Sequence, residues 1–229
     1  MMDSEERLKE VYYNMKKFEI LNRMAENGVV AVIRAESVEK AVRLGKAISE
    51  GGIGALEITF TVPHADEVIE KLIAEKVDAL VGAGTVLDAT TCRYAIIKGA
   101  NFIVSPAFDK EVCEICNLYQ VPYFAGCMTP TEIIQALKAG VDVIKVFPGD
   151  IVTPKYFKDI HGPLPQANLL PSGGVSLENI KDWIKNGAIA VSAGSSLTAP
   201  AKTGDYEGVT EEARRFVEEV KKARAELKK

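Results

Sequence analysis

The chain is poor in the residues that build disulfide frameworks and metal centres. Its 229 residues include only two histidines, His64 and His161, so a zinc site is not expected. The four cysteines lack the spacing of a disulfide framework, which favours a reducing cytoplasm; they are Cys92, Cys113, Cys116 and Cys127. Cys113 and Cys116 form a C-x-x-C pair, but the segment around them has helical periodicity and no second pair follows. We therefore interpret this pair as part of a helix and not as a redox or metal site.

Long hydrophobic runs and a large charge excess are absent as well. The longest apolar stretches are strand-sized, so no membrane-spanning helix is expected. The net charge of −4 gives no reason to expect nucleic-acid binding. The first residues, Met1–Glu6, are acidic and do not have the apolar core of a secretory signal. A hydrophobic content of 47% and a charged content of 26% are typical of a water-soluble globular protein.

The sequence does contain a regular alternation of short apolar runs with amphipathic stretches. The runs are rich in β-branched residues and predict eight strands, at Val29–Arg34, Ala55–Phe60, Ala79–Val86, Phe102–Ala107, Pro122–Cys127, Val143–Pro148, Asn168–Gly173 and Ile189–Gly194. Between them, Thr129, Pro130 and Glu132 form a capping-box-like helix start. Glycines also stand where helices should end in a left-handed conformation, at Gly51, Gly99, Gly140 and Gly187.

Eight strand–helix units with short connections predict an α/β protein with a closed (β/α)8 barrel, also called a TIM barrel. We expect residues 1–229 to form a single domain, because no linker or low-complexity segment interrupts the alternation. An additional amphipathic helix at residues 4–27 precedes the first strand and is predicted to cap the bottom of the barrel. The longest irregular connection is Thr198–Gly208.

Three charged residues occur on predicted strands. In Leu56–Phe60 the apolar side chains share one face, which turns Glu57 into the barrel. Lys145 lies alone in an apolar strand four units further round, so we expect it to face Glu57 at the barrel mouth. A low-dielectric site disfavours the charged form of an amine, and a neutral lysine can attack a carbonyl group. Arg34 ends the first strand and adds a cation suited to a carboxylate or a phosphate.

Each of these residues also has a purely structural interpretation. Glu57 can belong to a structural ion pair, and Lys145 can reach solvent or a nearby acid from the end of its strand. Arg34 can pair with Glu36 or another acid at the rim.

Loops rich in small residues follow three strands. The segment Gly82–Thr85 brings the hydroxyl group of Thr85 to the end of the third strand and lets a substrate approach closely. The loop after the seventh strand contains Ser172, Gly173 and Gly174, and the loop after the eighth strand contains Ser195. Loops at these two positions usually bind phosphate in this barrel, with amides and a helix N-terminus facing the anion. Small residues at strand ends can also form simple turns.

The order and spacing of these segments resemble those of the 2-keto-3-deoxy-6-phosphogluconate (KDPG) aldolases, which often also act on 4-hydroxy-2-oxoglutarate. The resemblance spans about residues 20–225 and is most specific at Leu56–Thr59, Val81–Val86, Phe102–Pro106, Lys145–Pro148 and Pro171–Val175. It implies a homotrimeric class I aldolase without metal or other cofactor. It also implies a 2-keto acid phosphate as substrate, in the Entner-Doudoroff pathway of carbohydrate metabolism.

The resemblance further implies roles for single residues. Lys145 occupies the position of the Schiff-base lysine, and Glu57 occupies that of the acid–base glutamate. Thr85 matches the threonine that meets the pyruvyl part of the substrate. The phosphate-contacting positions of the family correspond to Gly173, Gly174 and Ser195.

Two positions depart from the family pattern. Many members have an arginine four residues after the glutamate, where this chain has Thr61, and Arg34 is a hypothetical replacement for that cation. Many also have threonine where this chain has Ser172, which keeps the hydroxyl group but loses a methyl group.

Three alternatives to KDPG cleavage stay open. The first is the same chemistry on the 6-phosphogalactonate epimer or on unphosphorylated 4-hydroxy-2-oxoglutarate. The second is a non-catalytic phosphosugar-binding barrel in which Lys145 holds an anion. The third is a metal-dependent aldolase, which has the least support because no histidine lies on a predicted strand end.

Overall fold

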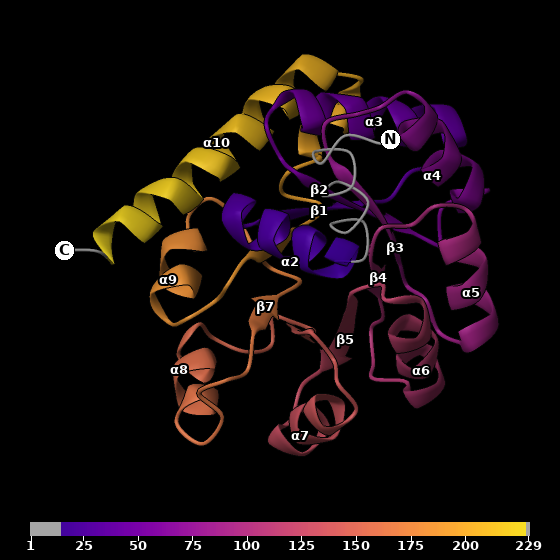
Figure 1. Cartoon of the computed structure of the whole chain (residues 1–229). Coiled ribbons are helices and arrows are strands. Elements are labelled where there is room, and N and C mark those ends of the chain that lie inside the picture. Colours follow the sequence, from indigo (N-terminus) through magenta and orange to yellow (C-terminus); the bar gives the residue numbers. More distant parts are fainter. Residues whose placement is uncertain (1–14, 228–229) are drawn as a thin grey trace, which may run out of the picture.

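A barrel of parallel strands forms the centre of the computed structural model, which describes residues 15–227 (Figure 1). Its strands are β1 Val29–Ile33, β2 Ala55–Thr59, β3 Leu80–Gly84, β4 Ile103–Val104, β5 Tyr123–Cys127, β6 Val143–Val146, β7 Leu169–Pro171 and β8 Val191–Ala193. They pair in the order β7-β6-β5-β4-β3-β2-β1-β8. Isolated parallel bridges from Leu169 to Ala188 and from Ser172 to Ser192 bring the two ends of the sheet together. The prediction of a (β/α)8 barrel is therefore confirmed.

Helices alternate with the strands and surround the barrel (Figure 1). They pack on the outward-facing side chains of the strands, such as Leu56 and Ile58 of β2. No helix in the described part of the chain is long and apolar enough to cross a membrane. The helices are α2 Lys16–Asn27, α3 Val38–Glu50, α4 Ala65–Ala74, α5 Ala89–Ile97, α6 Lys110–Tyr119, α7 Pro130–Lys138, α8 Lys155–His161, α9 Ile180–Lys185, the 3-10 helix η2 Ala199–Thr203 and α10 Tyr206–Glu226.

The predicted helix signals are mostly, but not entirely, present. Thr129 and Glu132 form the full capping box at the start of α7. Positive φ angles of 96°, 90° and 98° occur at three of the predicted glycines, Gly99, Gly140 and Gly187. The prediction was wrong for Gly51, which has φ −74°, while the next residue, Gly52, has φ 91°. Glycine at position 51 instead allows α10 to pack closely, because a Cβ there would lie 2.4 Å from the Cβ of Ala213 in α10.

The N-terminal end of the barrel is filled by apolar side chains and covered by α2. Ile20 and Met24 of α2 are buried in the same cluster as residues from inside the barrel. That cluster includes Phe102 and Phe124, whose rings stack with their centroids 5.4 Å apart. Figure 1 shows α2 lying across the strands. Residues 4–14 of the predicted N-terminal helix lie outside the described residues.

All strands except β5, which ends at Cys127 as predicted, end earlier than predicted at their C-terminal ends. For example, β4 contains only Ile103 and Val104, and β6 stops at Val146. The residues beyond these points leave the ladder and form the rim of the barrel. Polar side chains can be placed at this end, because the opposite end is already filled by the apolar cluster.

Candidate active site

Lys145 and Glu57 meet inside the barrel, although 88 residues separate them in the sequence. The distance between Lys145 Nζ and Glu57 Oε1 is 3.4 Å. Both side chains are buried, with exposed fractions of 7% for Lys145 and 2% for Glu57. Since both groups are buried, water screens their electrostatic interaction very little.

Glycines on the strands next to β2 and β6 allow close packing around these two side chains. A Cβ at Gly84, the last residue of β3, would lie 2.2 Å from Glu57 Oε1. Gly126 of β5 pairs with Lys145 in the sheet, and a Cβ there would lie 2.0 Å from the carbonyl oxygen of Pro106. The ring of Phe147 has its centroid 5.4 Å from Lys145 Nζ. The amine and the carboxyl group are therefore held in a confined space with little room for water.

Threonines lie at and just beyond the C-terminal ends of β2 and β3. Thr85 has φ 58°, a left-handed conformation that is rare for a β-branched residue. Backbone strain of this kind is concentrated at functional sites. Thr59 is buried; its hydroxyl group donates to the carbonyl oxygen of Ile33 at 3.1 Å and lies 2.9 Å from Thr61 Oγ1. At the position where many family members have arginine, Thr61 thus supplies a hydroxyl group.

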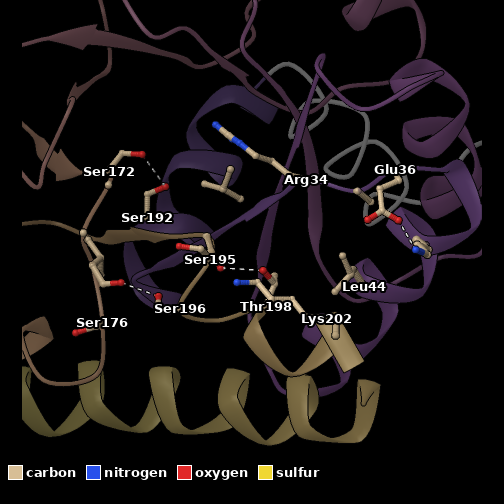
Figure 2. A pocket seen from close by; sticks show the side chains of 18 of the residues that line it. Arg34, Glu36, Leu44, Ser172, Ser176, Ser192, Ser195, Ser196, Thr198 and Lys202 are labelled. Carbon is tan, nitrogen blue, oxygen red and sulfur yellow. Dashed lines mark hydrogen bonds and ion pairs between the residues drawn. The ribbon is translucent and has the colours of Figure 1, made fainter. Parts of the chain in front are cut away.

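A cavity of about 660 Å³ opens over the C-terminal ends of β7, β8 and β1 (Figure 2). Its lining contains five of the predicted binding residues, namely Arg34, Ser172, Gly173, Gly174 and Ser195. Lys145, Glu57 and Thr85 do not line this cavity. Phe147 connects the two regions, because it lines the cavity and also lies beside Lys145. The Lys145–Glu57 pair is thus buried beside the cavity and does not line it.

The loops after β7 and β8 leave backbone N–H groups unpaired at the cavity. Gly173 and Gly174 have φ angles of 97° and 68°, which glycine adopts without strain. Within residues 15–227, the N–H groups of Gly173, Gly174 and Ser195 donate to no protein acceptor. The hydroxyl group of Ser172 donates to Ser192 Oγ at 3.4 Å. Unpaired amides gathered in this way suit an oxyanion such as phosphate.

Positive charge predominates around the cavity. Arg34, Lys40 and Lys202 line it together with the carboxylate of Glu36. Glu36 forms an ion pair with Lys40 and not with Arg34, and this hydrogen bond lowers the pKa of Glu36. Figure 2 shows the side chain of Arg34 extending in the direction of Ser172. Arg34 is thus available for a negatively charged ligand.

Our reading of the sequence did not identify Lys202 as a site residue. Lys202 belongs to the 3-10 helix η2, in the connection Thr198–Gly208 that was predicted to be irregular but contains η2 and the start of α10. The only signal in the sequence was the place of this segment after a barrel strand, where functional loops gather.

A (β/α)8 barrel that buries a lysine against a glutamate, beside a cavity lined by cations, has the features of an enzyme that forms Schiff bases. A family model described as KDPG and KHG aldolase matches residues 20–211. The chain therefore belongs to the KDPG and KHG aldolase family.

Relatives of known identity cover most of the chain. The chain is 34% identical over 197 residues to the 2-dehydro-3-deoxy-phosphogluconate aldolase of Treponema pallidum (strain Nichols). The matched region covers 84% of this chain and 92% of the relative. A solved structure described as native KDPGal is 30% identical with a TM-score of 0.80, covering 86% of this chain and 96% of the other. The KDPG aldolase of Legionella pneumophila, solved with pyruvate as a covalent carbinolamine, is 28% identical with a TM-score of 0.76. The match covers 82% of this chain and 93% of the Legionella chain.

Proposed function

We propose that this protein is a class I aldolase that cleaves KDPG reversibly to pyruvate and glyceraldehyde 3-phosphate. The observation that carries this proposal is the buried contact of 3.4 Å between Lys145 Nζ and Glu57 Oε1 in a member of this family. The relative from Legionella pneumophila supports it, because its pyruvate is held as a carbinolamine, the adduct that precedes a Schiff base. Neither a metal ion nor another cofactor takes part in the proposed chemistry.

The mechanism uses Lys145 as nucleophile and Glu57 as acid and base. The neutral amine of Lys145 attacks the C2 ketone, and loss of water gives a protonated imine. This imine draws electrons from the C3–C4 bond, which breaks as Glu57 accepts the proton of the C4 hydroxyl group. Glyceraldehyde 3-phosphate leaves, and an enamine remains on Lys145. Glu57 returns the proton to C3, and hydrolysis of the imine releases pyruvate and the free amine.

Other residues of the site would bind the two ends of the substrate. We assign the hydroxyl group of Thr85 to the pyruvyl part, which the strained backbone at this position supports. The unpaired amides after β7 and β8 support phosphate binding by Ser172, Gly173, Gly174 and Ser195. Arg34 would hold the substrate carboxylate in place of the arginine that many relatives have at the position of Thr61.

Replacing Arg34 by leucine is expected to raise KM about tenfold or more for every 2-keto acid substrate. The reason is the loss of a charge-assisted hydrogen bond to the carboxylate, worth about 1.5–3 kcal/mol. Steady-state kinetics with KDPG and with unphosphorylated 4-hydroxy-2-oxoglutarate would measure the change, and Arg34→Lys should retain part of the affinity. An increase confined to the phosphorylated substrate would instead place Arg34 at the phosphate.

Trapping with borohydride tests the proposed chemistry directly. The protein is incubated with pyruvate, treated with borohydride, digested and analysed by mass spectrometry. We expect a reduced pyruvyl adduct on the peptide that contains Lys145, and none on the peptides that contain Lys40 or Lys202, which line the neighbouring cavity. A protein that binds phosphosugars but gives no adduct would be the non-catalytic barrel.

A second candidate substrate is the 6-phosphogalactonate epimer of KDPG. The similarity to the structure described as native KDPGal favours it. Values of kcat/KM for the two epimers and for 4-hydroxy-2-oxoglutarate, measured in parallel, would identify the preferred substrate. A preference for the galactonate epimer would change the substrate and leave the role of Lys145 intact.

We also propose that the protein is a homotrimer in the cytoplasm, where its role would be carbohydrate breakdown. The four free thiols are consistent with a reducing compartment. Exposed apolar side chains on the neighbouring helices α5 and α6, Ile97 at 62% and Leu118 at 70%, support a surface that another copy covers.

Light scattering of the purified protein is expected to give the mass of three chains. Replacing Ile97 and Leu118 together by lysine should lower this mass, because charged residues are disfavoured in the core of an interface. Lysine at the exposed Ile151, on another part of the surface, serves as the control. A monomeric wild-type protein would contradict the trimer.

A further inference from the structure

The cavity beside the reactive pair contains a cation that the proposed mechanism does not use. Lys202 lines this cavity together with the loop residues Gly173, Gly174 and Ser195. Figure 2 shows its side chain pointing from η2 toward Ser195 and Thr198. The ammonium group therefore lies on the same side of the cavity as the unpaired amides after β8.

The backbone that carries Lys202 is held in place by hydrogen bonds. The N–H group of Ala201 donates to the carbonyl oxygen of Thr198 at 3.1 Å, and that of Gly204 donates to Ala201 at 3.0 Å. The hydroxyl group of Thr203 donates to the carbonyl oxygen of Pro200 at 3.0 Å. A cation on a fixed backbone binds an anion with a smaller loss of entropy than one on a mobile loop.

Among residues 15–227, no carboxylate forms an ion pair with Lys202, and this includes Glu36 at the same cavity. The other lysine that lines the cavity, Lys40, is already paired with Glu36. The nearby amides are uncharged, whereas a phosphate group carries about −1.5 to −2 charges at pH 7. A site built from amides alone would leave most of this charge without a partner.

We propose that Lys202 holds the distal phosphate of the substrate and thereby selects phosphorylated over unphosphorylated 2-keto acids. This inference rests on the proposed function, since it assigns the specificity of the same site. The amides of Gly173, Gly174 and Ser195 surround the phosphate oxygens, and Lys202 supplies the charge from η2. Arg34 and Lys145 act on the opposite, pyruvyl end of the substrate.

The test compares Lys202→Met with Lys202→Arg and with Lys40→Met. Lys202→Met is expected to raise KM for KDPG about tenfold, as the loss of one charge-assisted hydrogen bond predicts, with kcat changed less than about twofold. Its kinetics with 4-hydroxy-2-oxoglutarate should stay unchanged, and Lys202→Arg should restore a low KM for KDPG. Lys40→Met should raise KM for KDPG less than Lys202→Met does, because Lys40 is engaged by Glu36.

Two results would overturn the assignment. One is an unchanged KM for KDPG in Lys202→Met. The other is an equal increase in Lys40→Met, which would show that the total charge of the cavity, and not Lys202, sets the affinity.

Binding of inorganic phosphate separates this inference from the proposed function. Titration calorimetry with phosphate needs no turnover, and we expect the Kd to rise about tenfold in Lys202→Met and to rise less in Lys40→Met. A wild-type protein that binds phosphate through Lys202 but traps no pyruvate would refute the aldolase proposal alone. Trapping of pyruvate together with equal phosphate affinities in both variants would refute only the role of Lys202.

Discussion

Lys145→Ala is expected to lose both borohydride trapping of pyruvate and aldol cleavage, down to the background rate. The primary amine is the only group in the proposed mechanism that can form the imine, so no partial activity should remain. Mass spectrometry of the trapped protein and a coupled assay for glyceraldehyde 3-phosphate would measure the two effects. Trapping elsewhere in the chain would show that another lysine is the nucleophile.

The alanine variant has a structural cost that its control must separate from the chemistry. Removing the amine leaves the carboxyl group of Glu57 buried without a partner, and such a loss destabilises proteins by about 3–5 kcal/mol. Lys145→Arg keeps a cation opposite Glu57 but cannot form the imine under these conditions. We expect Lys145→Arg to melt closer to the wild-type temperature and to be equally inactive. If Lys145→Arg still trapped pyruvate, the assignment of the nucleophile would be wrong.

Glu57→Gln is expected to retain trapping of pyruvate and to lose about 10²–10⁴-fold in kcat for KDPG. Glutamine keeps the size and the hydrogen-bonding capacity of the side chain, but it cannot accept the proton of the C4 hydroxyl group. Exchange of the C3 protons of pyruvate for deuterium, followed by NMR, should slow by a similar factor. That measurement isolates the proton transfer between the imine and the enamine.

Glu36→Gln is the matched control for this second prediction. Glu36 lines the open cavity, which Lys145 does not line, and it is paired with Lys40. We expect its kcat and its rate of proton exchange to equal those of the wild type. Near-normal turnover in Glu57→Gln would remove Glu57 from the mechanism.

Both predictions depend on the separation of apolar and polar side chains between the two ends of the barrel interior. The N-terminal end holds the apolar cluster beneath α2, and the C-terminal end holds Lys145, Glu57 and Thr59. Gly84 is important to this arrangement, because any side chain at that position would occupy the space of the Glu57 carboxyl group. The small residues of β3 therefore serve the geometry of the site as well as the packing of the sheet.

Local patterns in the sequence determined the elements and the direction of their side chains. Alternation with a period of two placed Glu57 on the inner face of its strand and left Leu56 and Ile58 for the helices. The same argument turned Lys145 inward. These predictions needed no knowledge of distant parts of the chain, since a strand places successive side chains on opposite faces whatever its neighbours are.

Tertiary structure alone decided the distances and the partners. The contact of Lys145 with Glu57 at 3.4 Å depends on the closure of the whole sheet, which no local pattern encodes. Packing of α10 against Gly51 and the position of Lys202 over the cavity likewise join segments through the fold. Periodicity specifies which way a side chain points, whereas what it meets depends on how the elements pack in three dimensions.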